Sequence, residues 1–305
     1  MGGSTQVTGA GRPNGVALWW LGARPRTLPA AVVPVMVGAA VAATVGGGSL
    51  TWWRVAVALL VSLALQVGVN YANDYSDGVR GTDDVRVGPL RLVGSGMVPA
   101  GRVRSAALGA FGVAAAAGLA LAATTSWWLL AVGTAALAAG WGYTGGPRPY
   151  GYLGLGEVFV FVFFGLVATA GTTYVAVGSV PAAAWWAGVG VGAIACALLV
   201  VNNLRDIPTD SVVGKRTLAV RMGDAGTRRF YVLLLLVAVL AVVEVAVTAT
   251  PWALLGLVAI AVAVQPVRAV RSGATGRDLI PVLGATGRLQ AVYGIAMTVG
   301  LVIGS

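Results

Sequence analysis

The sequence predicts an all-α protein that crosses a membrane several times. Of its 305 residues, 58% are hydrophobic and only 10% are charged, whereas soluble domains carry roughly 25% charged residues. Several apolar stretches reach the ~20 residues that a helix needs to cross the hydrocarbon core of a bilayer. These two observations exclude a water-soluble globule and favour a polytopic bundle of transmembrane helices, about nine of them.

Nine apolar windows, bounded by glycine, proline and charged residues, are the candidate membrane spans. We expect them to form a single transmembrane domain over residues 19–305. A disordered cytoplasmic segment, residues 1–18, is expected to precede it, because the chain begins with polar residues rich in Gly, Ser and Thr. The expected spans are about 28–46, 52–73, 103–123, 126–142, 155–177, 182–203, 229–249, 251–267 and 287–304.

The distribution of basic residues supports this number of spans and predicts their orientation. With the N-terminus in the cytoplasm, every one of the 20 Lys and Arg residues except Arg54 falls on the cytoplasmic side, as the positive-inside rule requires. Tryptophans agree independently, because pairs at 52–53, 127–128 and 185–186 each open an even-numbered span at the opposite interface, a depth that indole rings prefer.

Composition also excludes several function classes. The net charge of +10 does not indicate nucleic-acid binding, because the basic residues separate apolar spans instead of gathering on one water-exposed surface. The chain has no histidine, which excludes imidazole metal ligands and His-based acid–base catalysis. The single cysteine, Cys196, lies within an apolar stretch, where we expect it to act as a small buried hydrophobe.

Six of the ten acidic residues lie in two segments, each at the cytoplasmic end of an even-numbered span. In the first segment Asn70, Asp74 and Asp77 are spaced at i, i+4 and i+7, so a continuing helix projects them from one face. The second segment repeats this pattern at i, i+4 and i+8 with Asn202, Asp206 and Asp210, of which the second and third are acidic. Each span is therefore expected to deliver one amide and two carboxylates to a common mouth.

Crowded carboxylates beside a low-dielectric core repel one another and are costly to ionise. Mg²⁺ relieves that cost, and it prefers one or two carboxylates together with substrate phosphate oxygens and water. The two segments are thus predicted to hold Mg²⁺ with a diphosphate bridged between them. Four interleaved basic residues are candidate ligands of the remaining phosphate oxygens: Arg80, Arg205, Lys215 and Arg216.

A simpler interpretation is available for several of these charges. Acids in cytoplasmic loops often do no more than solvate the loop, and Asp83, Asp84 and Asp224 suit that role. For the other basic residues of these loops, a topological role is favoured over a catalytic one; they are Arg86, Arg91, Arg102, Arg104, Arg228 and Arg229.

Both acidic segments resemble the signatures of the UbiA superfamily of intramembrane aromatic prenyltransferases, and the resemblance extends from about residue 19 to residue 225. Within that superfamily, the stretches at 143–147 and 214–218 favour the subgroup that acts on 1,4-dihydroxy-2-naphthoate in menaquinone synthesis. Glu157 departs from the pattern, since Asp is expected there. The segments that carry the resemblance are Arg24-Pro25-Arg26-Thr27-Leu28-Pro29, Asn73-Asp74-Tyr75-Ser76-Asp77, Gly81-Thr82-Asp83, Arg91-Leu92-Val93-Gly94-Ser95-Gly96, Tyr143-Thr144-Gly145-Gly146-Pro147, Gly154-Leu155-Gly156-Glu157-Val158-Phe159-Val160 with Phe163-Phe164-Gly165, Asn202-Asn203-Leu204-Arg205-Asp206 and Gly214-Lys215-Arg216-Thr217-Leu218.

The resemblance implies a role for each matching residue. The first metal–diphosphate motif would contain Asn70, Asp74 and Asp77, with Asp83 or Asp84 nearby, and the second would contain Asn202, Asp206 and Asp210. The carboxylates of Asp74, Asp77, Asp83, Asp206 and Asp210 would be the metal ligands. Arg24, at the mouth, could contact either substrate. The residues that would bind substrate are Asn70, Asn73, Arg80, Asn202, Arg205, Lys215, Arg24 and Tyr143.

The resemblance also implies an activity and a location. The partners would be polyprenyl diphosphate, an aromatic acid acceptor and the lipid bilayer, with Mg²⁺ as cofactor, and the helices would surround a cavity open to lipid. The location would be a bacterial plasma membrane, with the active-site loops in the cytoplasm. Three alternatives stay open: a relative that prenylates 4-hydroxybenzoate, homogentisate or haem; an ion-coupled transporter; and a quinone-binding membrane subunit. Prenyl length, the number of metal ions and oligomeric state are not predicted.

Overall fold

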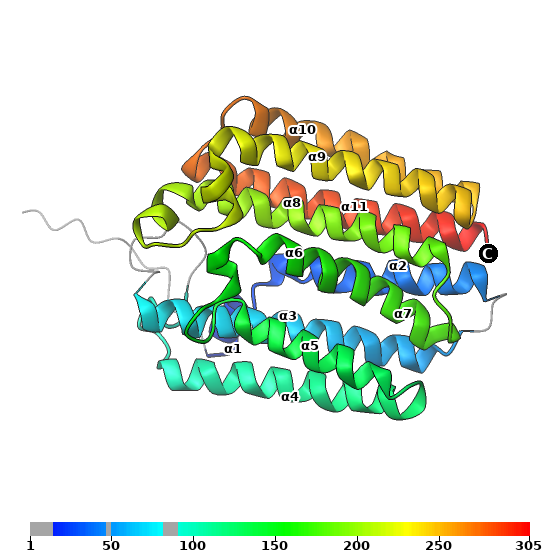
Figure 1. Ribbon diagram of the computed structural model, residues 1–305, viewed down its shortest axis with the longest axis horizontal. Coiled ribbons are helices and arrows are strands. Elements are labelled where there is room, and N and C mark those ends of the chain that lie inside the picture. Colours follow the sequence, from blue (N-terminus) through cyan, green and yellow to red (C-terminus); the bar gives the residue numbers. More distant parts are fainter. Residues whose placement is uncertain (1–14, 47–49, 82–90) are drawn as a thin grey trace, which may run out of the picture.

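The computed structural model describes residues 15–46, 50–81 and 91–305, and these residues fold into helices joined by short connections. The long helices run roughly side by side along one direction, so that the connections gather at the two ends of the bundle (Figure 1). The elements are α1 (Gly15–Gly22), η1 (Pro25–Thr27), α2 (Pro29–Val45), α3 (Trp52–Arg80), α4 (Ala100–Thr124), α5 (Trp128–Gly142), η2 (Tyr150–Leu153), α6 (Gly156–Val160), η3 (Phe161–Val167), α7 (Ala168–Val177), α8 (Ala182–Val212), α9 (Leu218–Thr248), η4 (Pro251–Val258), α10 (Ala259–Arg271), η5 (Gly276–Asp278) and α11 (Leu279–Ile303).

The all-α membrane fold predicted from the sequence is confirmed. Among the described residues, seven helical segments are long and apolar enough to cross a membrane, and α1–η1 with α2 forms an eighth as a pair bent by 53°. The remaining window, Trp128–Gly142, is a shorter apolar helix. Each of the nine predicted windows thus falls on a helix, the chain is a multi-pass membrane protein, and the exact count of nine spans remains a prediction.

The helices that carry the two acidic segments are longer than predicted. α3 continues past residue 73 to Arg80, and α8 continues past residue 203 to Val212. Polar residues do not stop a helix unless they favour another backbone conformation. α3 is followed directly by Gly81, whose φ is 70°, and α8 is followed after Val213 by Gly214, whose φ is 76°; a glycine of positive φ commonly closes a helix. The acidic side chains therefore project from rigid helix ends.

The N-terminal segment also differs from the prediction. Residues 15–18, predicted to be disordered, already belong to α1, while residues 1–14 lie outside the described part. Leu18 and Trp19 pack against a buried cluster that includes Tyr71 and Leu92, and the Tyr71 hydroxyl donates to the Trp19 carbonyl at 2.9 Å. Apolar burial thus outweighs the polar character of the preceding residues.

α8 is the central helix of the bundle. Its most apolar window is 72% buried, against 28–44% for the other six spans. Small residues allow this burial, because they let neighbouring backbones approach closely. A Cβ atom built on Gly165 of η3 would lie 2.6 Å from the Gly192 Cα and 2.7 Å from the Gly188 carbonyl oxygen. This contact places α6, η3 and α7 directly against α8.

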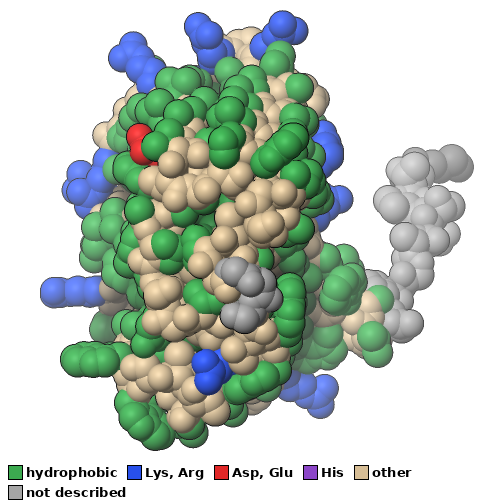
Figure 2. Space-filling view, turned by 90° about the vertical axis from the view of Figure 1, so that its right-hand side faces the viewer, with side chains coloured by type: hydrophobic (Ala, Val, Ile, Leu, Met, Phe, Trp, Pro, Cys, Tyr) green, Lys and Arg blue, Asp and Glu red, His purple; other side chains and the backbone are tan. Residues whose placement is uncertain are grey.

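The two ends of the bundle differ in chemistry. α3 and α8 finish at the same end, which also carries η2, the start of α4 and the end of α10 (Figure 1); we call it the charged end. At the opposite end the surface is mainly hydrophobic or uncharged, and most of the visible basic side chains project beyond the outline of this face (Figure 2). Arg54 belongs to that end, where its guanidinium donates to the carbonyls of Thr124 and Val175.

Candidate active site

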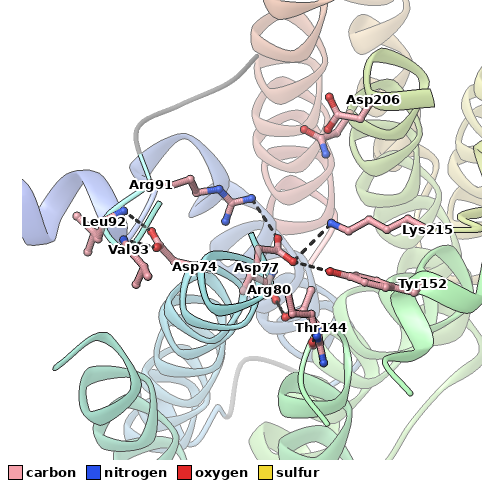
Figure 3. Close-up of polar contacts among 12 residues, drawn as sticks. Asp74, Asp77, Arg80, Arg91, Leu92, Val93, Thr144, Tyr152, Asp206 and Lys215 are labelled. Atoms are coloured by element: carbon pink, nitrogen blue, oxygen red, sulfur yellow. Dashed lines mark hydrogen bonds and ion pairs between the residues drawn. The ribbon is translucent and has the colours of Figure 1, made fainter. Parts of the chain in front are cut away.

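Asp77, near the C-terminal end of α3, is the residue at the charged end that polar side chains from several segments contact. Its side chain is 4% exposed, and Arg91 Nη2 lies 3.6 Å from Oδ2. Lys215 Nζ lies 3.5 Å from Oδ1, and the Tyr152 hydroxyl donates to that oxygen at 2.8 Å. Three separate segments therefore aim polar groups at one carboxylate (Figure 3).

Lys215 links this carboxylate to the second acidic segment. Its ammonium lies 4.5 Å from the centre of the Tyr152 ring, an arrangement that adds a cation–π attraction. Burial lowers the pKa of Lys215, but the Asp77 carboxylate, the Tyr152 oxygen and the Asp210 carboxylate outweigh it, and the pKa lies above its ordinary value. Lys215 is therefore protonated at neutral pH and lies within electrostatic reach of acids from both α3 and α8.

The turn after α5 is held against α3 by two polar residues. Asn73 accepts a hydrogen bond from the Thr144 hydroxyl at 2.7 Å, and the Arg80 guanidinium donates to the carbonyls of Thr144 and Gly146. Arg80 also lies 5.5 Å from the centre of the Tyr152 ring. Asn73 and Asp77, spaced i, i+4, thus share the helix face that looks toward Tyr152 and the turn.

The second acidic segment is paired within itself. Arg205 donates from Nε and Nη2 to the two carboxylate oxygens of Asp206, at 2.7 and 2.8 Å. The same Nη2 donates to Asn202 Oδ1 at 2.9 Å. Arg205 and Asp206 are both buried, and Asp210 is partly exposed one turn further along α8. Figure 3 places Asp206 across the mouth from Asp77, with Lys215 reaching between them.

Two residues predicted for the site have other partners in this structure. The Asn70 amide donates to the Ala23 carbonyl at 2.8 Å and to the Thr27 hydroxyl at 3.0 Å. Both carboxylate oxygens of Asp74 accept backbone N–H groups, from Leu92 at 2.8 Å and from Val93 at 2.9 Å. Asn70 and Asp74 share a helix face as predicted, but each fastens a loop against α3 and neither carboxylate oxygen of Asp74 points toward Asp206 (Figure 3).

Arg24 begins the turn that Asn70 fastens. It is the one described non-glycine residue with positive φ, at 53°, a conformation that costs of order 1 kcal/mol or more for a side chain with a Cβ atom. The Thr27 hydroxyl accepts from Asn70 and donates to the Arg24 carbonyl at 2.9 Å. The predicted residues Asp83 and Asp84 lie outside the described residues.

An apolar cavity of about 310 Å³ adjoins the charged end. α3 contributes to both, since Val69 lines the cavity and lies two helical turns, about 12 Å, before Asp77. Tyr143 and Tyr150 line the cavity and contact each other edge to face, with ring centres 5.6 Å apart. Tyr150 in turn stacks on Phe159 at 3.9 Å. Tyr143, predicted to bind substrate, is thus placed in the wall of a hydrophobic chamber.

Glu157, which departs from the expected Asp, is buried between α6 and α8. Its Oε1 accepts from the Asn203 amide at 2.9 Å, and its backbone carbonyl accepts from the Cys196 thiol at 3.1 Å. The carboxylate therefore ties α6 to the residue that follows Asn202. Cys196 is buried as predicted.

Comparison with known proteins establishes the family. The model of the UbiA prenyltransferase family matches residues 31–278. The chain belongs to the UbiA prenyltransferase family. It is similar to 1,4-dihydroxy-2-naphthoate octaprenyltransferase of Mycobacterium tuberculosis, with 50% identity over 94% of this chain and 98% of the relative. The protein of that name from Haemophilus influenzae is 34% identical over 94% of this chain and 96% of its own.

Solved structures of UbiA homologues share the fold. The homologue from Archaeoglobus fulgidus bound to GPP and Mg²⁺ aligns with a TM-score of 0.62 and 14% identity, covering 92% of this chain and 99% of that one. The apo homologue from Aeropyrum pernix K1 aligns with a TM-score of 0.68 and 17% identity, covering 90% and 98%. UbiA homologues thus use this helical architecture even where few residues are identical.

The donor set of this UbiA member suits Mg²⁺ held together with a diphosphate. Within residues 15–46, 50–81 and 91–305, no group of three or more acidic or thiol side chains is close enough to enclose a metal ion. The mouth does offer carboxylate oxygens from α3 and α8, and Mg²⁺ commonly takes only one or two carboxylates and completes its shell with phosphate oxygens and water. The residues at the mouth therefore fit Mg²⁺ that binds together with a diphosphate.

Three residues of the site are not predicted from the sequence. Tyr152 and Thr144 follow the apolar helix α5 in a glycine- and proline-rich stretch that is typical of an ordinary turn, and the pattern of basic residues favours a topological role for Arg91. The one available signal is the density of Tyr and Arg beside these glycines, since loops positioned by rigid helices often carry function. Their contacts with Asn73 and Asp77 join residues 71 to 75 positions apart or 14 positions apart, which no local pattern reveals.

Proposed function

We propose that this protein transfers a polyprenyl group from polyprenyl diphosphate to 1,4-dihydroxy-2-naphthoate, releasing diphosphate and CO₂ and giving demethylmenaquinol, the hydroquinone form of demethylmenaquinone. The observation that carries the proposal is the convergence of acids and bases from α3, α8 and two loops around Asp77, beside an apolar cavity. The 50% identity to 1,4-dihydroxy-2-naphthoate octaprenyltransferases over nearly the full length of both chains supports the choice of acceptor.

The diphosphate end of the donor is assigned to the charged mouth. Asp77, Asp206 and Asp210 would hold Mg²⁺ with the diphosphate, and the ion would neutralise charge on its oxygens. Lys215, Arg91 and Arg205 face these acids and can take phosphate oxygens as alternative partners, Arg as a fork and Lys as a point charge. Their preorganised positive charge stabilises the diphosphate as the allylic C–O bond breaks.

The hydrocarbon end of the donor is assigned to the cavity. Its lining is almost entirely aliphatic and aromatic, with contributions from Phe159, Phe163 and Phe164, so it excludes water from an allylic cation. The electron-rich ring carbon of the naphthoate that bears the carboxylate attacks that cation. A C–C bond forms there, and the carboxylate departs as CO₂, leaving its electron pair to the ring.

The proposed setting is a bacterial plasma membrane, with the charged end in the cytoplasm. The Lys and Arg residues that flank the site, among them Arg80, Arg91 and Lys215, belong to the segments that the positive-inside rule assigns to that side. Both diphosphate and an aromatic acid are water-soluble groups, and this orientation lets them reach the mouth from the cytosol.

The experiment that tests the function incubates membranes containing the protein with Mg²⁺, a polyprenyl diphosphate and a panel of aromatic acids. The expected result is a product whose mass equals the naphthoate plus the prenyl group minus CO₂. A product formed only from 4-hydroxybenzoate or homogentisate would assign another acceptor. Movement of labelled substrate across the membrane of proteoliposomes without formation of any product would identify the protein as a transporter instead of an enzyme.

A further inference from the structure

Asp74 is fully buried, yet it lies only three residues before the carboxylate at the centre of the site. Its Oδ2 accepts the Leu92 N–H at 2.8 Å and its Oδ1 accepts the Val93 N–H at 2.9 Å. Two consecutive backbone N–H groups form a small anion-binding concavity. Here that concavity is filled by a side chain of the protein itself, and both carboxylate oxygens are used.

A second residue of α3 makes the same docking possible. Gly78 lies one turn after Asp74, and a Cβ atom built on it would lie 2.5 Å from Val93 Cγ1 and 2.6 Å from Val93 Cβ. Leu92, which precedes Val93 in this turn, is fully buried in a cluster with Tyr71 and Ala72. The turn is therefore held on α3 by hydrogen bonds to Asp74, by the burial of Leu92 and by the missing side chain of Gly78.

The consequence of this docking is the position of Arg91. It is adjacent to Leu92, its side chain is 11% exposed, and Nη2 lies 3.6 Å from Asp77 Oδ2. Figure 3 shows Asp74 and Asp77 leaving α3 in different directions, Asp74 toward the turn and Asp77 toward Lys215, with Arg91 spanning the space above them.

We infer that Asp74 is a positioning residue, which holds the turn at residues 91–93 on α3 so that Arg91 reaches the mouth where the diphosphate binds. This inference rests on the proposed function and changes the role expected for Asp74, which is not a metal ligand. The two acids of the first segment therefore have different roles, since Asp77 faces the substrate and Asp74 acts through Arg91.

The test compares five variants: Asp74→Asn, Arg91→Ala, the double variant Asp74→Asn/Arg91→Ala, Gly78→Ala and, as a matched control, Gly101→Ala. Gly101 lies at the same end of the bundle, where a Cβ atom would meet nothing within 4 Å. For each, one measures KM for the prenyl diphosphate, the Mg²⁺ concentration that gives half-maximal rate, and hydrogen exchange of the peptide containing residues 91–95 by mass spectrometry.

Asp74→Asn and Gly78→Ala are expected to speed exchange in that peptide and to raise KM for the prenyl diphosphate about tenfold, as the loss of one charge-assisted hydrogen bond does. The Mg²⁺ midpoint should stay unchanged. Adding Asp74→Asn to Arg91→Ala should raise KM for the prenyl diphosphate by less than a further factor of about two, because the effects of residues that act through one contact are not additive. Gly101→Ala should match the wild type in all three measurements.

Three results would each overturn the inference: an Mg²⁺ midpoint raised by Asp74→Asn, full additivity with Arg91→Ala, or unchanged exchange at residues 91–95. The last measurement needs no turnover. If the wild-type protein forms no prenylated product, the proposed function fails. Hydrogen exchange, together with calorimetric binding of prenyl diphosphate plus Mg²⁺ to wild type and Asp74→Asn, still decides the role of Asp74.

Discussion

At the scale of single residues, the site is a set of pairs between opposite charges. Asp77 lies between Arg91 and Lys215, and Asp206 is held by its neighbour Arg205. Removing one partner of a buried ion pair leaves the other uncompensated, which is far more costly than losing an exposed pair. Substitutions at these positions should therefore be far more costly than substitutions of acids on the surface.

The first prediction concerns Asp77. Asp77→Asn removes the charge that Arg91 and Lys215 face, and we expect Mg²⁺-dependent prenyl transfer to fall by about 10²- to 10³-fold, the usual cost of one preorganised electrostatic contact. Product formation in membranes measures it. Asp224→Asn is the matched control, because Asp224 pairs with Arg228 on α9 and its side chain is 56% exposed. An Asp77→Asn enzyme with wild-type rates would remove Asp77 from the site.

The second prediction concerns Tyr152. Tyr152→Phe deletes the hydroxyl that donates to Asp77 at 2.8 Å and keeps the ring beneath Lys215. We expect kcat/KM to fall about tenfold, in line with a hydrogen bond to a charged group, and Tyr152→Ala to lower it further by removing the cation–π contact. Equal rates for the two variants would mean that the ring contributes nothing.

At the scale of elements, the sequence predicts the helices better than it predicts what they present. Apolar windows locate each helix, and the i, i+4 spacing correctly places Asn70 and Asp74 on one face of α3, whereas Asp77 points away from Asp74 toward Lys215 (Figure 3). Periodicity does not say which of these meets a loop and which meets the site. That choice depends on Gly78 and Leu92, whose contacts bring the turn at residues 91–93 back onto α3.

The helix formed by α6, η3 and α7 shows a second limit of sequence patterns. The apolar window predicts one regular span, but residues 161–167 adopt a π-helix, a rare conformation that often marks functional sites. This stretch turns Phe163 and Phe164 into the cavity wall while Gly165 contacts α8. Such a change in helical pitch depends on packing against other helices, so the spacing of apolar residues along the chain does not predict it.

The third prediction concerns the cavity and belongs to α7. Gly171 lines it, and a Cβ atom there would meet nothing within 4 Å, so a larger side chain would occupy the space assigned to the prenyl tail. We expect Gly171→Phe to lose activity with long polyprenyl diphosphates and to retain it with geranyl diphosphate. A series of donors of increasing length measures this.

The control for that variant is Gly109→Phe, on α4 in open space and outside the cavity lining. It should use every donor as the wild type does. Equal loss across all donor lengths in Gly171→Phe would indicate general misfolding, and unchanged use of long donors would place the tail elsewhere.

At the scale of the whole molecule, the bundle has one end rich in charge and one end nearly free of it, and the proposed orientation follows from that difference. The native Cys196 is buried, so single cysteines can be introduced against a low background. Ser272 is exposed between α10 and η5 at the charged end, and Ser179 is exposed between α7 and α8 at the other.

The fourth prediction uses these two positions. In intact cells, a membrane-impermeant maleimide should label Ser179→Cys and leave Ser272→Cys unlabelled, and inside-out vesicles should reverse the pattern. The wild-type protein, with Cys196 alone, should stay unlabelled in both. Labelling of Ser272→Cys from outside the cell would invert the proposed orientation and put the mouth on the wrong side for a cytosolic acceptor.

The internal pairing of Asp77 with Arg91 and Lys215, and of Asp206 with Arg205, has a consequence for how the chamber is loaded. Each of these charged side chains already has a partner of opposite charge, so a lone cation or a lone anion entering the charged end would leave one set of side chains without its partners. A metal–diphosphate complex offers both signs at once and allows every pair to exchange partners together. Loading is therefore expected to be concerted, and departure of the spent diphosphate should let the side chains of the protein find one another again.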